Sequence, residues 1–200
     1  YLMRVYRDGD RSAGLLYRLG MLAASAQDYN RTVQMLMPLA NRQDAPPEAL
    51  ALLARALRNR GQAPRAVRTL AAAMDHVPPS ARAALQVELA RSLVMAGRWE
   101  RAGDAWREVA DVAGSNREEA LFDAARCYYH AGRYAPAMEC IDTMPASAYE
   151  DPEVRRWKKK IEDARFGRTA GADDANSILP AFGRAPEPGV LDANEAPELP

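Results

Sequence analysis

The chain has few of the groups on which catalysis or metal binding usually depends. Among its 200 residues are two histidines and two cysteines. His76 and His130 are far apart, and neither has a second ligand at helical spacing. Zinc requires about four nitrogen or sulfur ligands. There is also no Ser/His/Asp arrangement and no glycine-rich phosphate loop. We therefore expect no catalytic residue, no metal and no cofactor, and the chain is predicted not to be an enzyme.

Net charge and long apolar runs are also lacking. Lysines and arginines number 27, as do aspartates and glutamates, so no global charge favours nucleic acid or an anionic membrane. No run approaches the ~20 apolar residues of a membrane helix, and direct membrane insertion of this fragment is not expected. Arginine outnumbers lysine 24 to 3, which together with the many alanines indicates a GC-rich bacterial genome.

What the sequence does contain is an internal repeat. An apolar or small pair is followed seven positions later by a turn residue, and then by an aromatic and a small residue. The turn positions are 27, 61, 97 and 132, with spacings of 34, 36 and 35. A fixed period of this length predicts stacked supersecondary units. The copies read Leu19-Gly20, Gln27, Tyr29, Thr32; Leu53-Ala54, Gly61, Ala66; Leu89-Ala90, Gly97, Trp99, Ala102; and Ala124-Ala125, Gly132, Tyr134, Ala137.

Each copy has the pattern of an antiparallel helix pair, with apolar residues at helical spacing on both sides of the turn. A glycine there lets the first helix end in a left-handed conformation. Small residues such as Ala90 and Ala102 suit a close crossing of the two helices, and Ser80 is a candidate N-cap. The predicted helices are 11–26, 29–41, 47–60, 63–76, 80–96, 99–113, 116–131, 134–143 and 152–166.

These motifs resemble the tetratricopeptide repeat family, whose unit is a helix–turn–helix of 34 residues. The third copy is the most similar, and Pro78 matches the closing proline of the second. Ala63, Gln27 and Thr32 depart from the family pattern. The resemblance covers residues 12–146. It implies an all-α protein, a right-handed superhelical α-solenoid of about four repeats that binds other proteins.

The regions outside the repeats have separate interpretations. Residues 1–9 are interpreted as a remnant of a preceding repeat, residues 10–150 as the four repeats and residues 151–166 as a capping helix. Val154, Trp157 and Ile161 give that helix one apolar stripe, and Lys158–Lys160 are assigned to its solvated face. Residues 167–200 are rich in Pro, Ala and acids and are predicted to be a disordered linker or tail. From Arg168 onward the net charge is about −4.

A partner-binding groove is predicted on the face of each pair's first helix that points away from the second helix. Solenoids bind ligands on such concave surfaces. Arginine favours partners with carboxylates because it can pair with them in a bidentate way. We therefore expect an extended or helical peptide segment, possibly acidic, to bind there. The predicted groove residues are Tyr17, Met21, Arg55, Arg58, Arg91, Met95, Phe122, Arg126 and Tyr129.

Several functional alternatives follow from this pattern. The main hypothesis is a non-catalytic protein-interaction scaffold within a larger bacterial protein. The repeat array followed by a linker resembles periplasmic scaffolds of Pel-type or cellulose-type exopolysaccharide export. Localisation stays unknown: the periplasm if the export hypothesis holds, otherwise the cytoplasm. The alternatives are an autoinhibited domain whose acidic tail occupies its own groove, and a nucleic-acid-binding helical repeat. For Cys127 and Cys140, buried thiols, a disulfide and a redox switch all remain open.

Overall fold

The computed structural model describes residues 2–7, 9–112 and 116–167, and within them all regular elements are helices. The predicted fold class, an all-α solenoid of helical repeats, is confirmed. The elements in chain order are α1 (Leu2–Arg7), α2 (Ala13–Ser25), α3 (Tyr29–Leu36), the 3₁₀ turn η1 (Met37–Leu39), α4 (Pro47–Asn59), α5 (Ala63–Met74), α6 (Pro79–Met95), α7 (Trp99–Val112), α8 (Arg117–His130), α9 (Tyr134–Asp142), the 3₁₀ turn η2 (Ala146–Glu150) and α10 (Pro152–Arg165).

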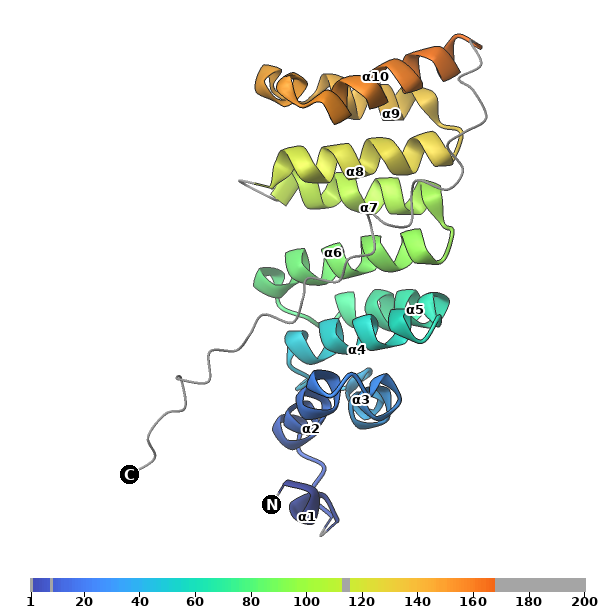
Figure 1. Ribbon diagram of the computed structural model, residues 1–200. Helices are drawn as coiled ribbons and strands as arrows, with labels where there is room; N and C mark the ends of the chain where they lie inside the picture. The colour runs from blue at the N-terminus through green and yellow to red at the C-terminus, as the bar shows by residue number, and fades with distance from the viewer. Residues whose placement is uncertain (1, 8, 113–115, 168–200) are drawn as a thin grey trace. The chain divides into compact units, whose positions relative to one another are not determined.

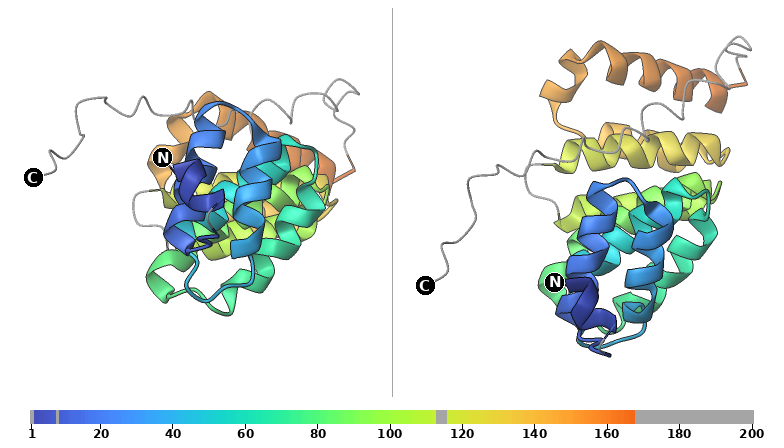
Figure 2. Two further views of the ribbon diagram at one scale, coloured as in Figure 1. Left: turned by 90° about the horizontal axis from the view of Figure 1, so that it is seen from below. Right: turned by 60° about the horizontal axis from the view of Figure 1, so that its bottom comes forward.

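The helices pack in sequential pairs that follow one another along the stack (Figure 1). The pairs are α2 with α3, α4 with α5, α6 with α7 and α8 with α9, while α10 packs on α9. The members of the first pair lie side by side in both views of Figure 2. Each pair also packs on the next, so no pair buries its apolar face alone, as the repeat architecture requires.

Left-handed residues end the first helix of every pair. The φ angles are 55° at Gln27, 69° at Gly61, 66° at Gly97 and 72° at Gly132. These are the four turn positions predicted from the repeat. In each case the chain reverses within a few residues and starts the second helix, so one local conformation sets the geometry of the pair.

The core of each pair uses small residues at the predicted positions. Ala90 and Ala102 are fully buried between α6 and α7, and the corresponding alanines of the second and fourth pairs are also inaccessible. Thr32 takes the small-residue position in the first pair. Its hydroxyl donates a 2.8 Å hydrogen bond to the carbonyl of Asp28, which satisfies it inside the core.

Three local predictions are wrong or incomplete. The helix expected over 29–41 ends at Leu36, because Pro38 lacks an N–H and the chain tightens into η1. Ser80 does not cap α6, which begins at Pro79 after an N-cap at Pro78. The turn η2 was not predicted. It is held by Tyr149, whose hydroxyl donates a 2.9 Å hydrogen bond to the carbonyl of Ile141.

Of the tail predicted over 167–200, residues 168–200, with the acidic segment, lie outside the described residues. The hypothesis that this segment occupies the groove is therefore not tested by the structure. Residues 2–7 form α1, which packs on α2.

Candidate protein-interaction site

A hollow of about 660 Å³ lies along the first helices of three successive pairs. We call it the first-helix groove. Predicted groove residues Tyr17, Met21 and Arg55 line it together with alanines and leucines of α4 and α6. The burial of the Tyr17 ring and the nearby carboxylate of Glu48 raise the pKa of its phenol, so this hydroxyl stays neutral. The groove thus has a largely apolar floor with Arg55 among its lining residues.

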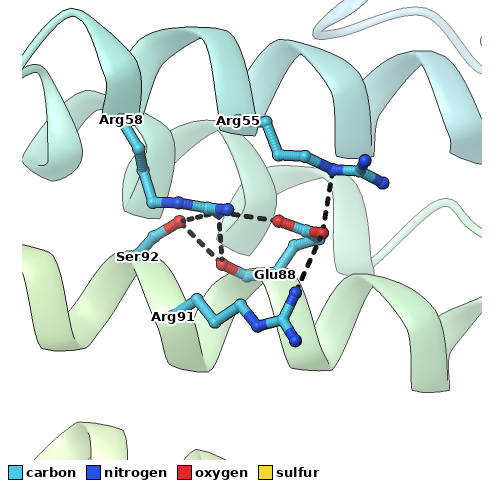
Figure 3. Close-up of polar contacts among 5 residues, drawn as sticks. All are labelled: Arg55, Arg58, Glu88, Arg91 and Ser92. Atoms are coloured by element: carbon cyan, nitrogen blue, oxygen red, sulfur yellow. Dashed lines mark hydrogen bonds and ion pairs between the residues drawn. The ribbon is translucent and has the colours of Figure 1, made fainter. Parts of the chain in front are cut away.

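Beside this groove one buried carboxylate holds three arginines (Figure 3). Glu88 of α6 is 5% exposed. Its Oε1 lies 3.1 Å from Nε of Arg55 and 3.9 Å from Nη1 of Arg91. Its Oε2 lies 2.7 Å from Nη1 of Arg58. The cluster carries three positive charges against one negative charge, so two positive charges are uncompensated within it.

The side chains of the three arginines differ in their exposure to solvent. The side chain of Arg58 is 12% exposed, and it also donates to Ser92 Oγ at 3.2 Å. Burial lowers the pKa of Arg58, against the opposing effect of Glu88. Arg55 and Arg91 are 44% and 36% exposed. Arg58 therefore joins α4 to α6, whereas Arg55 and Arg91 remain available to a partner.

Helix α10 contacts the predicted groove residues of the fourth pair. The Trp157 ring of α10 lies 6.5 Å from that of Phe122 and 5.4 Å from that of Tyr129, between centroids. Arg126 is 5% exposed, and its guanidinium carbon lies 5.4 Å from the Trp157 centroid. Sequence reasoning placed these three residues on an open surface, but at this end of the stack Trp157 packs against them. Met95, the last residue of α6, is 44% exposed and is not among the lining residues of the first-helix groove.

Two titrating groups on α8 have strongly shifted pKa values. Burial raises the pKa of Asp123 to about 7, although Arg126, 3.5 Å away, opposes the shift. Burial lowers the pKa of His130 to about 4, helped by the positive charges of Lys160 and Arg126. Around neutral pH, His130 is therefore uncharged, and Asp123 lies close to its midpoint.

A second hollow separates α6 from α8. Whereas α2 packs on α4 and α4 on α6, the main contacts of α6 and α8 in this region are with α7 between them. The resulting cavity, which we call the α6–α8 pocket, measures about 260 Å³. Its described lining residues are Ala83, Ala84, Val87, Arg91, Trp106, Val109, Val112, Asn116, Glu119 and Ala120.

Two of the three lysines of α10 are less solvated than predicted. Lys158 lies 3.0 Å from Asp142 and over the ring of Tyr149. The ammonium of Lys160 lies 4.7 Å from the Trp157 centroid and 5.1 Å from that of Tyr129. Lys159 is exposed as expected. The sequence alone did not reveal that the side chains of Lys158 and Lys160 pack along apolar surface and place their ammonium groups near aromatic rings.

Both cysteines are buried and free. Burial raises the pKa of Cys140 to about 11 and also raises that of Cys127. Thiols of this kind are poor nucleophiles because the thiolate is the reactive form. In the described part of the chain no three potential metal ligands cluster. Nor is any helix there sufficiently long and apolar to cross a membrane.

The comparisons with known proteins agree with this architecture. Residues 113–161 match the family model of the tetratricopeptide repeat. No curated protein matches the chain significantly. A structure from Podosopora anserina, of a putative kinesin light chain with nearly identical tetratricopeptide-like repeats, is similar to the chain. It has a TM-score of 0.56 and 21% identity, over 76% of this chain and 86% of that one. A substituted form of the same repeats gives a TM-score of 0.52 and 20% identity, over 77% and 95%.

The structural likeness, at this identity, supports the fold alone, and the family match supports the predicted resemblance. The chain is an α-solenoid of tetratricopeptide-like helical pairs. Repeats of this family generally serve as protein–protein interaction scaffolds, and folds of this kind are typically non-catalytic.

Glu88 is a residue of this candidate site that the sequence analysis did not single out. A signal for it exists, because Leu85, Glu88 and Ser92 follow the 3- and 4-residue spacing of a buried helical stripe. All three are buried. A carboxylate in such a stripe needs a cationic partner, and arginines of α4 and α6 supply it.

Proposed function

We propose that this chain is a non-catalytic scaffold that binds a protein partner through the first-helix groove, and that the bound segment carries carboxylates. The observation that carries the proposal is the Glu88 cluster beside the groove. Two of its arginines are partly exposed, and their charge exceeds what Glu88 can neutralise. A carboxylate of the partner would neutralise one of the two excess positive charges and gain bidentate hydrogen bonds.

The pre-existing contacts with Glu88 support recognition rather than compete with it. Arg55 and Arg91 share the same Glu88 oxygen, which limits how far their guanidiniums can swing. A partner therefore meets side chains that have already lost part of their conformational freedom, and such preorganisation reduces the entropic cost of binding. Both exposed arginines come from first helices, one from α4 and one from α6.

The apolar floor supplies the other part of the interaction. Tyr17, Met21 and Leu52 are among the groove residues, and Met21 is 38% exposed. Apolar contacts of this kind provide affinity, whereas charged rims mainly set orientation and association rate. The partner segment that fits is therefore amphipathic, with apolar side chains toward α2 and α4 and acidic ones toward Arg55 and Arg91.

Paired substitutions test the proposal. Arg55→Gln with Arg91→Gln removes both exposed guanidiniums while leaving Arg58 paired with Glu88. The matched control is Arg65→Gln with Arg68→Gln, which removes two exposed arginines from α5. Arg126 is not suitable because its side chain is 6% exposed. Each form is used for affinity capture from cells of the source organism, quantified by mass spectrometry.

We expect the groove variant to lose at least tenfold in recovery of a partner that the control retains. Circular dichroism should show equal helicity in all three forms. Equal recovery by both variants would contradict the proposal. The same measurement without residues 168–200 addresses the acidic segment: if it competes for the groove, its removal increases recovery.

The narrower role in bacterial exopolysaccharide export rests on the sequence resemblance described above. Its test is the identity of the captured partner, which should be an exopolysaccharide-modifying enzyme or a secretion component. A partner from another pathway would reject the export role and leave the scaffold function intact.

A further inference from the structure

We propose that the α6–α8 pocket receives one large apolar side chain of the partner segment, and that Arg91 at its edge binds a carboxylate next to that side chain. This inference rests on the proposed function. It extends the binding surface beyond the first-helix groove and specifies a pattern of adjacent residues in the partner.

The pocket exists because the packing of first helices is interrupted. α2 packs on α4 and α4 on α6, but α6 and α8 each pack chiefly on α7 here. Trp106 and Val109 of α7, both 5% exposed, therefore contribute to a lining shared with α6 and α8. Ala120 of α8 is 2% exposed, and Val87 of α6 is partly exposed. Apolar walls of this kind favour an apolar occupant over water.

The size of the pocket suits a side chain of the partner rather than a whole small-molecule ligand. The cavity of about 260 Å³ falls below the ~300–1,000 Å³ of pockets that enclose whole small-molecule ligands. One aromatic side chain of the partner can enter a space of this size. Such anchors in well-packed pockets contribute a large share of binding energy at protein interfaces.

The charges around the pocket determine which partner residue is favoured next to the apolar side chain. Among the described lining residues, Arg91 of α6 is the cation and Glu119 of α8 the carboxylate. Arg91 lies 3.9 Å from Glu88, which Arg55 and Arg58 already neutralise. A carboxylate of the partner is therefore favoured on the α6 side and repelled by Glu119 on the α8 side. The pattern is an apolar anchor with an acidic neighbour toward α6.

The two hollows meet on α6, which explains how one segment can use both. Ala84 lines both the α6–α8 pocket and the first-helix groove. Arg91 belongs to the first of these hollows and Arg55 to the second, and both contact the same Glu88 oxygen. A segment crossing α6 at Ala84 would place apolar side chains in both hollows and its carboxylate between the two arginines.

The test uses a random peptide library displayed on phage and selected on the full chain. Val87→Phe fills the α6–α8 pocket with a side chain of this chain, and Ala81→Phe fills the first-helix groove, which Ala81 lines. Both positions are partly exposed, so the larger rings can be accommodated. Affinities of the selected peptides are measured by isothermal titration calorimetry on the wild-type chain and on both variants.

We expect selected peptides to share a large apolar residue next to an acidic one, and to bind Val87→Phe at least tenfold more weakly than wild type. Arg91→Gln should weaken the same peptides, and replacing their acidic residue should remove that sensitivity. The inference is overturned if no selected peptide depends on Val87. Sensitivity to Ala81→Phe and Arg55→Gln alone would leave the proposed function standing, whereas insensitivity to all these changes would reject both.

Discussion

Gln27 has a left-handed backbone conformation at the turn position that glycine occupies in the other three pairs. Its φ of 55° lies in a region that costs a residue with a Cβ roughly 1–2 kcal/mol, which glycine avoids. Replacing Gln27 by glycine would relieve this strain. Part of the resulting stabilisation is offset because glycine is more flexible in the unfolded chain. Gln27→Gly is therefore expected to raise the free energy of unfolding by about 1 kcal/mol, measured by urea denaturation followed by circular dichroism.

The reverse change provides the control. Gly97 has a φ of 66° and open space where a Cβ would stand. Gly97→Gln is therefore expected to destabilise by a similar amount through backbone strain alone. If Gln27→Gly lowers stability, the left-handed backbone at the turn does not have the same energetic cost in all four pairs.

The shifted pKa values of Asp123 and His130 give opposite pH dependences. The folded chain keeps a proton on Asp123 up to about pH 7, well above its ordinary pKa of 3.8, so this group's contribution to stability falls as pH rises between about 4 and 7. His130 has a folded pKa of about 4 against 6.5, so its contribution falls as pH drops from 6.5 to 4. In the wild type the two effects largely cancel.

Removing one of these two titrating groups should reveal the pH dependence that the other contributes to stability. Asp123→Asn is expected to leave a stability that rises with pH between about 4 and 6.5 more steeply than that of the wild type. His130→Asn should shift the slope in the opposite direction. The measurement is the urea midpoint at several pH values across this window, and parallel curves for all three forms would contradict the assignment.

At the scale of helices, glycine marks a close approach of α7 to α8. A Cβ at Gly103 would lie 2.8 Å from the Tyr128 ring, whose hydroxyl donates to Asp104 at 2.7 Å. Gly103→Ala should therefore overpack this interface and destabilise by roughly 1–3 kcal/mol. Gly14, also helical, has nothing within 4 Å, and Gly14→Ala should be neutral or stabilise by up to about 1 kcal/mol. Thermal unfolding of the two variants compares them, and equal shifts would contradict the predicted contact.

The junction of α4 and α6 depends on the buried charge of Glu88. Glu88→Gln leaves the largely buried Arg58 without its carboxylate, and we expect a loss of about 3 kcal/mol. Glu100→Gln is the matched control, because Glu100 and Arg133 lie 2.6 Å apart but are both more than half exposed. That change should cost less than about 1 kcal/mol. Equal losses in urea denaturation would show that burial does not determine the strength of the Glu88 cluster.

The helices could be predicted because their signals are local. Turn residues at a regular spacing and apolar residues at helical spacing locate the helices, although the end of α3 and the start of α6 depend on prolines. The groove could be predicted only in part. Tyr17, Met21 and Arg55 line it, but the covering of Phe122, Arg126 and Tyr129 depends on where Trp157 of a later helix packs. The α6–α8 pocket arises from an interruption in packing that the constant repeat spacing does not reveal.

At the scale of the described solenoid, the two partly exposed arginines of the Glu88 cluster lie beside the first-helix groove and the α6–α8 pocket. Arg55 lines the groove and Arg91 lines the pocket, and residues of α2, α7 and α8 complete the two linings. At the fourth pair, the Trp157 contacts leave less of the predicted surface accessible. The proposed partner binding is therefore centred on α4 and α6 rather than spread evenly along the array.

Site-specific photocross-linking tests this location most directly. A photoreactive p-benzoylphenylalanine at Ala84, which lines both hollows, is compared with the same residue at Arg68 on the exposed face of α5. We predict that the Ala84 position cross-links a partner in cells of the source organism, that Arg55→Gln with Arg91→Gln abolishes the product, and that the Arg68 position gives none. Cross-linking from Arg68 but not from Ala84 would contradict binding through the first helices.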